Sequence, residues 1–173
     1  MGKLILISGA NSSGKSRYAE ELIGKTTGER YYIATMVPQT AENYTRIEKH
    51  KKQRAGMGFA TLELPYQVGA APAGKDSVVL LEDVSNLLAN VIFEKGGEEK
   101  QVLSDIKELL SHCGLLAVVT IGGLRDEGYD EQTAAYINGL NRLNEELAEL
   151  SDCFIQMENG VPQFVKGELN GII

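Results

Sequence analysis

The sequence has few of the residues that build metal clusters and disulfide frameworks. Its 173 residues include no tryptophan, two histidines, two cysteines and four prolines. Cys113 and Cys153 lie far apart and match no metal-ligand spacing, which speaks against a structural zinc site. We expect both to be reduced and buried, although the sequence alone leaves open whether they pair.

Long apolar runs and an excess of positive charge are also missing. No apolar run approaches the ~20 residues of a membrane-spanning helix, and Met1-Gly2-Lys3 leads into only four apolar residues, Leu4–Ile7, unlike a secretory signal. The net charge of −7 opposes non-specific binding to nucleic acid. We therefore expect a cytoplasmic protein with neither a membrane nor a nucleic acid as its partner.

What the chain does have is the composition of a globular protein. Hydrophobic residues make up 43% and charged residues 24%, so disorder is a poor explanation. A chain of this length can bury a substantial core but is short for two domains. The prediction is one domain over residues 1–173.

Short apolar strands alternate with amphipathic helices along the chain, which predicts a mostly parallel sheet with helices on both faces. The strands are expected at Lys3–Ser8, Arg30–Thr35, Ala60–Leu64, Ser77–Glu82 and Leu115–Ile121. The helices are expected at Lys15–Ile23, Thr40–Arg54, Val84–Glu94, Glu98–His112 and Glu131–Leu150. The segments Asp152–Glu158 and Val161–Lys166 flank Asn159-Gly160 and predict a C-terminal β-hairpin.

A phosphate-binding loop (P-loop) follows the first predicted strand. The pattern GxxxxGK[ST] is complete in Gly9, Ala10, Asn11, Ser12, Ser13, Gly14, Lys15 and Ser16. Its main-chain amides can surround phosphate oxygens, Lys15 supplies positive charge to the β- and γ-phosphates, and Ser16 can ligate Mg²⁺. The alternative, a Gly/Ser-rich turn without function, explains neither the strand before it nor the helix after it. The prediction is a P-loop NTPase fold that binds GTP or ATP.

An acidic pair ends the buried strand Ser77–Glu82. Glu82 and Asp83 would lie at the carboxyl edge of the sheet, where ligands of α/β proteins bind. Either carboxylate could hold Mg²⁺, and Glu82 is the stronger candidate. The alternative is an acidic start to the next helix.

The helix Thr40–Arg54 is strongly basic in an otherwise acidic chain. Arg46, His50 and Arg54 share one face because they are spaced by four. Surrounding cations should lower the pKa of His50 and keep its imidazole neutral and nucleophilic, and the same cations would stabilise a pyrophosphate leaving group. A solvated surface helix is the simpler alternative.

Several segments together resemble the bifunctional adenosylcobinamide kinase / adenosylcobinamide-phosphate guanylyltransferase family. They are GANSSGKS (9–16), YYIAT (31–35), RIEKHKKQR (46–54), FATLELP (59–65), VVLLEDVSNLLANVIF (78–93) and NRLNEELAELSD (141–152). The P-loop is common to many families, whereas RIxxHxxxR followed by an aromatic-x-T-x-E-x-P segment is much more specific. The resemblance implies a RecA-like sheet, a homotrimer and a corrinoid substrate.

The resemblance also implies roles for individual residues. His50 falls where the family forms a guanylyl-histidine, and Lys15 is the P-loop lysine. Nucleotide contacts are implied for Ile33, Ala34, Thr35, Arg46, Lys51, Lys52, Gln53, Arg54, Glu63 and Glu82, and metal contacts for Ser16 and Glu82. The chain departs from the family pattern at Ser12, Phe59 and Asp83, where Arg, Trp and Cys are common. It also has Ile121-Gly122-Gly123-Leu124 in place of Asn-Glu-Val-Gly, from which we expect a change in the corrinoid site or in one of the two activities.

Two other functions are compatible with the P-loop. One is a small-molecule kinase in which the basic helix only binds phosphates, without a guanylyl-histidine. The other is a regulatory protein that binds a nucleotide and hydrolyses it slowly.

Overall fold

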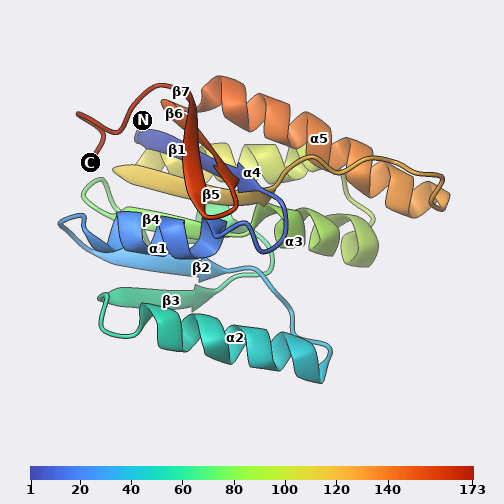
Figure 1. The fold of residues 1–173 in the computed structure, drawn as a ribbon, viewed down its shortest axis with the longest axis horizontal. Coiled ribbons are helices and arrows are strands. Elements are labelled where there is room, and N and C mark those ends of the chain that lie inside the picture. The colour runs from blue at the N-terminus through green and yellow to red at the C-terminus, as the bar shows by residue number, and fades with distance from the viewer.

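One seven-stranded sheet forms the centre of the protein in a computed structural model that describes residues 1–173 (Figure 1). Its strands are β1 (Lys3–Gly9), β2 (Arg30–Ala34), β3 (Phe59–Glu63), β4 (Val78–Glu82), β5 (Leu115–Ile121), β6 (Cys153–Glu158) and β7 (Val161–Lys166). They are ordered β3-β2-β4-β5-β1-β6-β7. Only β6 and β7 pair antiparallel, so the predicted mostly parallel sheet and C-terminal hairpin are confirmed.

The helices also match their predicted positions to within a residue or two at most ends. They are α1 (Lys15–Gly24), α2 (Ala41–Arg54), α3 (Val84–Ala89), α4 (Glu99–His112) and α5 (Glu131–Leu150). The predicted helix Val84–Glu94 is α3 continued by a π-helical turn, η2 (Asn90–Glu94). A short 3₁₀ helix, η1 (Val68–Ala70), was not predicted.

Helices cover both faces of the sheet because its central strands are apolar on both sides. Leu4 and Leu6 of β1 pack with residues of α3, α4 and α5, whereas Ile5 and Ile7 point the other way and pack against α1. Cys113 and Cys153 lie on opposite faces, buried and unpaired, as expected.

The basic helix α2 lies outside these layers, beside the edge strand β3 (Figure 1). It begins with a capping box: the side chain of Thr40 accepts from the Asn43 amide, and that of Asn43 accepts from the Thr40 amide. Arg54 is its one buried residue, so few apolar contacts hold this helix. None of the protein's helices combines the length and the apolar character needed to cross a membrane.

Candidate active site

The P-loop connects β1 to α1 with a backbone that depends on its glycines. Gly14 has φ 85° and precedes α1 without any side-chain cap, so the first amides of the helix remain free for an anion. A Cβ at Gly9 would lie 2.4 Å from Ser13 Oγ and 3.0 Å from the Met157 carbonyl oxygen. The loop is therefore shaped by residues that lack a side chain at these two positions.

Lys15 folds back over this loop. Its Nζ donates to the Ala10 carbonyl oxygen at 3.1 Å, and its side chain is buried. Burial lowers the pKa of Lys15, although the carboxylates of Asp83 and Glu82 act in the opposite direction. An anionic ligand in the loop would compensate the cost of holding this charge in a buried site.

Ser16 and Glu82 meet at the carboxyl edge of the sheet. The Ser16 hydroxyl donates to Glu82 Oε1, and the Tyr32 hydroxyl donates to Oε2 at 3.2 Å. Burial raises the pKa of Glu82 to about 7, and the bond from Ser16 opposes that rise. A hydroxyl and a carboxylate are both oxygen donors of the kind Mg²⁺ prefers, so the two residues fit such an ion.

Asp83 has a structural role. Its side chain accepts from the Asn86 amide at 2.7 Å and caps α3. Its main chain is bonded in both directions to the buried Thr35 hydroxyl, at 2.8 and 2.9 Å. Asp83 is thus the helix start that the sequence offered as an alternative, and Glu82 faces the P-loop.

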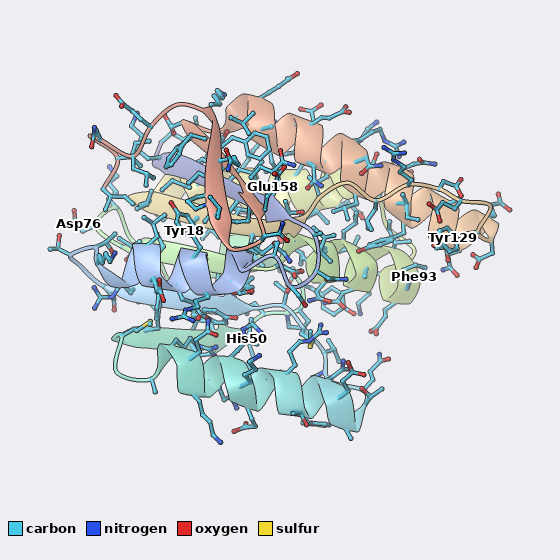
Figure 2. All side chains as sticks on the ribbon, in the orientation of Figure 1. Tyr18, His50, Asp76, Phe93, Tyr129 and Glu158 are labelled. Atoms are coloured by element: carbon cyan, nitrogen blue, oxygen red, sulfur yellow. The ribbon has the colours of Figure 1, made fainter.

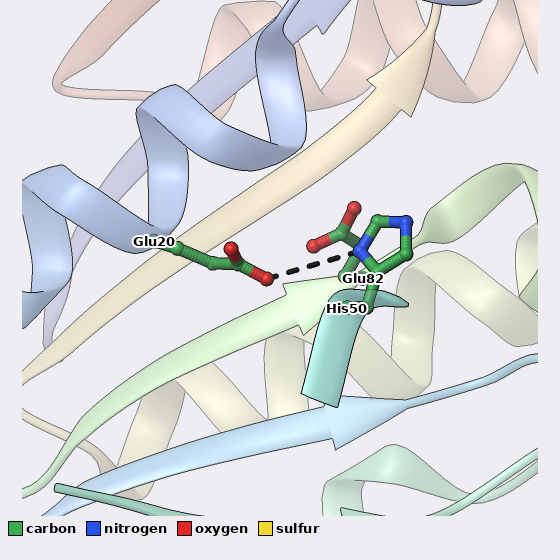
Figure 3. Close-up of side chains that lie close together, drawn as sticks. All are labelled: Glu20, His50 and Glu82. Atoms are coloured by element: carbon green, nitrogen blue, oxygen red, sulfur yellow. Dashed lines mark ion pairs between the residues drawn. The ribbon is translucent and has the colours of Figure 1, made fainter. Parts of the chain in front are cut away.

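His50 reaches the same site from α2 and lies beside two carboxylates. Its Nδ1 is 3.8 Å from Glu20 Oε1, an ion-pair distance longer than a hydrogen bond (Figure 3). One ligand atom each from His50, Glu20 and Glu82 lies within 4.8 Å of the others. Figure 2 labels His50 on the side of α2 that faces α1.

The expected pKa shift of His50 is therefore wrong in direction. The Glu20 carboxylate raises the pKa of His50, against the opposing effects of burial and of the Arg54 charge. The carboxylates of Glu20 and Glu82, which the sequence did not identify as neighbours of His50, outweigh burial and the Arg54 charge in setting this pKa.

Residues 5–165 match the family model described as "Cobinamide kinase / cobinamide phosphate guanyltransferase". The chain belongs to this family. It is 32% identical to the "Bifunctional adenosylcobalamin biosynthesis protein CobU" of Escherichia coli strain K12, and 32% identical to the protein of the same name from Salmonella typhimurium strain LT2. Each alignment is 124 positions long and covers 64% of this chain and 67% of the relative.

A solved structure supports the fold independently of the family. An ATPase from the type III secretion system of pathogenic bacteria superimposes with a TM-score of 0.60 at 10% sequence identity. The alignment covers the whole of this chain but 59% of that ATPase. This likeness confirms the predicted α/β P-loop NTPase fold.

The inner face of α2 carries three further residues for which the family resemblance implies nucleotide contacts: Arg46, Gln53 and Arg54. Arg54 lies over the Tyr32 ring, with its guanidinium carbon 3.7 Å from the ring centroid, and donates to Thr61 Oγ1 at 3.4 Å. Gln53 donates to Glu20 Oε2. Arg46 is exposed, yet its charge adds to burial in lowering the pKa of Lys15. Arg46 is therefore the residue of this group whose charge acts on the P-loop lysine.

Other implied contacts are not drawn together. Lys51 and Lys52 are exposed; Lys51 pairs with Glu48 at 3.3 Å, and Lys52 lines an outer groove of the helix. Glu63 is exposed on β3 and forms no hydrogen bond or ion pair. The Ile33 side chain is buried in the core, so only its main chain could meet a ligand. Ala34 is partly buried at the end of β2.

The segment that departs from the family pattern is tied to the P-loop. The Gly122 amide donates to the Gly9 carbonyl oxygen at 3.2 Å, and a Cβ at Gly122 would lie 2.3 Å from Ser8 Oγ. The amide of Ile121 donates to Ser85 Oγ, and its carbonyl accepts from Asn144. A side chain at position 122 would require the Ser8 hydroxyl to move, and with glycine there this chain has no polar side chain at that position.

Glu20 and Tyr32 are site residues that were not predicted from the sequence. Glu20 lies on the α1 face formed with Ser16, Ala19 and Ile23, and it is fully buried. A charged residue in the apolar stripe of a helix was the available signal, because such a position is normally apolar. Tyr32 gave no such signal, since an aromatic residue is ordinary in a buried strand.

Proposed function

We propose that this chain catalyses both reactions named by its family. It phosphorylates adenosylcobinamide with ATP or GTP, and it transfers GMP from GTP to adenosylcobinamide phosphate through a guanylyl group on His50. The observation that supports this most directly is that His50, from α2, stands within 4.8 Å of Glu82, the carboxylate bonded to P-loop Ser16.

In the kinase reaction, the chain mainly positions and neutralises the phosphates. The amides of Gly9 to Ser16 hold the nucleotide's phosphate groups, and Lys15 stabilises the charge on the transferred group. Ser16 and Glu82 would hold Mg²⁺, which supplies positive charge to the phosphate oxygens when bound.

In the guanylyl reaction, a ring nitrogen of neutral His50 attacks the α-phosphorus of GTP. A nitrogen–phosphorus bond forms, and the bond to the β-phosphate bridging oxygen breaks, so that pyrophosphate leaves with the electron pair. Arg46 and Arg54 stand on the same face of α2 as His50 and stabilise the departing charge. The corrinoid phosphate oxygen then takes GMP from the histidine and restores the neutral ring.

The partners follow from the same assignment. We propose GTP or ATP and a corrinoid as the small-molecule substrates, and a cytoplasmic homotrimer as the working state, the latter from the family resemblance alone.

Intact-mass measurement after incubation with GTP and a magnesium salt tests the assignment. The native protein should gain the mass of one GMP, His50→Ala should gain none, and Lys49→Ala, on the outer face of the same helix, should behave like the native protein. Formation of ADP from ATP that depends on cobinamide, without any GMP adduct, would instead assign a kinase alone. Nucleotide binding with neither activity would assign a regulatory role.

A further inference from the structure

We infer that Glu20 is the residue that positions His50 for the guanylyl reaction. In this arrangement Glu20 holds the proton on Nδ1, so that Nε2 is the nitrogen that receives GMP. The inference rests on the proposed function of His50 and adds a residue and a tautomer to it.

The carboxyl group of Glu20 is unusual because it is fully buried and only one of its two oxygens has a hydrogen-bond partner. Gln53 donates to Oε2, whereas Oε1 has no hydrogen-bond partner. His50 Nδ1, 3.8 Å away, is likewise a buried atom without a partner. Leaving both atoms unpaired is costly in a protein interior, and a shift of under about 1 Å would bring them to hydrogen-bond distance.

Glu20 is also better placed than Glu82 for this task. Both Glu82 oxygens already accept hydrogen bonds, from Ser16 and from Tyr32. Glu20 comes from α1, the helix that follows the P-loop directly, so the carboxylate is fixed to the same rigid element that begins with Lys15. Figure 3 shows the second ring nitrogen of His50 on the far side of the imidazole from Glu20.

The chemistry explains why a carboxylate is needed at this position. When neutral His50 uses the lone pair on Nε2 to bond the α-phosphorus, Nδ1 keeps its hydrogen and the ring becomes a cation. Glu20 then stabilises this cation without taking part in any bond to phosphorus. The carboxylate of a catalytic triad acts on its histidine in the same way. When the acceptor removes GMP, the ring returns to its neutral form with the proton still on Nδ1.

A histidine tautomer measurement on the native protein tests the inference, and a variant serves only to assign the signals. The protein has two histidines, so ¹⁵N–¹H correlation spectra of the side chains are readily assigned with His112→Asn. In mildly alkaline buffer the native protein should show His50 with hydrogen on Nδ1 and a bare Nε2. A native ring with hydrogen on Nε2 would overturn the inference.

Kinetics of the variant Glu20→Gln supply a second test, because glutamine keeps the shape but loses the charge. GMP adduct formation should slow by about 10²- to 10⁴-fold, with the KM for GTP and the cobinamide-dependent release of ADP nearly unchanged. Glu21→Gln, which alters the exposed neighbour on α1, should match the native protein. Should Glu20→Gln fold poorly, Glu20→Asp replaces it and should retain an intermediate rate.

The outcomes separate this inference from the function on which it rests. Absence of an adduct on the native protein would reject the proposed function itself. If the native protein forms the adduct and Glu20→Gln forms it equally fast, the role of Glu20 is rejected and the proposed function stands. The same holds if Glu20→Gln loses adduct formation and kinase activity in parallel.

Discussion

Two main-chain carbonyls converge on the ring of His112, at the last residue of α4. Its Nδ1 lies 3.0 Å from the Ala73 oxygen and its Nε2 lies 2.9 Å from the Gly69 oxygen. Carbonyls only accept, so a ring N–H of His112 donates to one of these two oxygens, and the tautomer decides which. The His112 side chain therefore holds the loop after η1 against the end of α4.

Replacing this side chain should weaken the fold. The variant His112→Ala removes the ring that contacts both carbonyls, and we expect a loss of about 1–3 kcal/mol in the free energy of unfolding. Thermal unfolding would show this as about 2–4 °C for each kcal/mol. Ser111→Ala removes a bond to the Glu108 carbonyl at an exposed position and should stay within about 0.5 kcal/mol of the native protein. Equal stability of the two variants would show that the His112 contacts contribute little.

Single residues of the site differ in how well the sequence predicted them. Lys15, Ser16 and Glu82 were predictable because each ends a strand or begins a helix whose period is plain, and strand ends meet at one sheet edge. The environment of His50 was not, since its pKa depends on Glu20, thirty positions away in the sequence and on another helix. The two helices become neighbours only in the folded protein, where Gln53 and His50 of α2 meet Glu20 of α1.

At the scale of elements, α2 is the helix most dependent on local signals. Its contacts with the rest are polar, through Glu20, Tyr32 and Thr61, and helices without an apolar face gain little from tertiary packing. Its capping box at Thr40 and Asn43 therefore matters more than a cap on a buried helix would. We expect the amides of α2 to exchange with solvent before those of β1 and β5.

The variant Thr40→Ala should loosen α2 selectively. Loss of the cap costs about 1 kcal/mol, which raises the population of the open helix about fivefold. Hydrogen exchange followed by mass spectrometry should show faster exchange in Ala41–Arg54 and little change elsewhere, and GMP adduct formation should slow with it.

A second threonine on the same helix supplies the control. Thr45 donates to the Ala41 carbonyl within the helix and caps nothing, so Thr45→Ala should leave exchange in α2 unchanged or slower, because alanine favours helix. Uniformly faster exchange across the sheet in Thr40→Ala would mean that α2 unfolds only together with the whole protein.

On the scale of the whole molecule, the alternation of strands and helices predicted the fold class but not the strand order. The runs VVLLE and LLAVVTI indicate buried central strands, yet nothing local states that β5 lies between β4 and β1. That order sets the site, because β1 brings the P-loop and β4 brings Glu82, while β2 places Tyr32 and the following α2 beside them.

A nucleotide bound at this edge would join elements that are otherwise held separately: the P-loop, the end of β4 and the loosely packed α2. Ligands that bind only the folded state stabilise it by mass action, by about 2.7 kcal/mol at a concentration of 100 times Kd. We therefore expect magnesium with GTP or ATP to raise the midpoint of thermal unfolding by about 5–10 °C.

Variants at the two ends of α1 show whether that rise comes from the P-loop. Lys15→Ala should lose most of it because the phosphates lose their buried cation, whereas Lys25→Ala changes an exposed lysine just beyond the same helix and should keep it. Chelation of magnesium should reduce the rise in the native protein. In Glu82→Gln, the unfolding midpoints measured with and without magnesium should differ less than they do in the native protein. A folded native protein whose midpoint responds to neither nucleotide would contradict the assignment of this edge as a nucleotide site, because a ligand that bridges three elements cannot bind tightly without stabilising their joint fold.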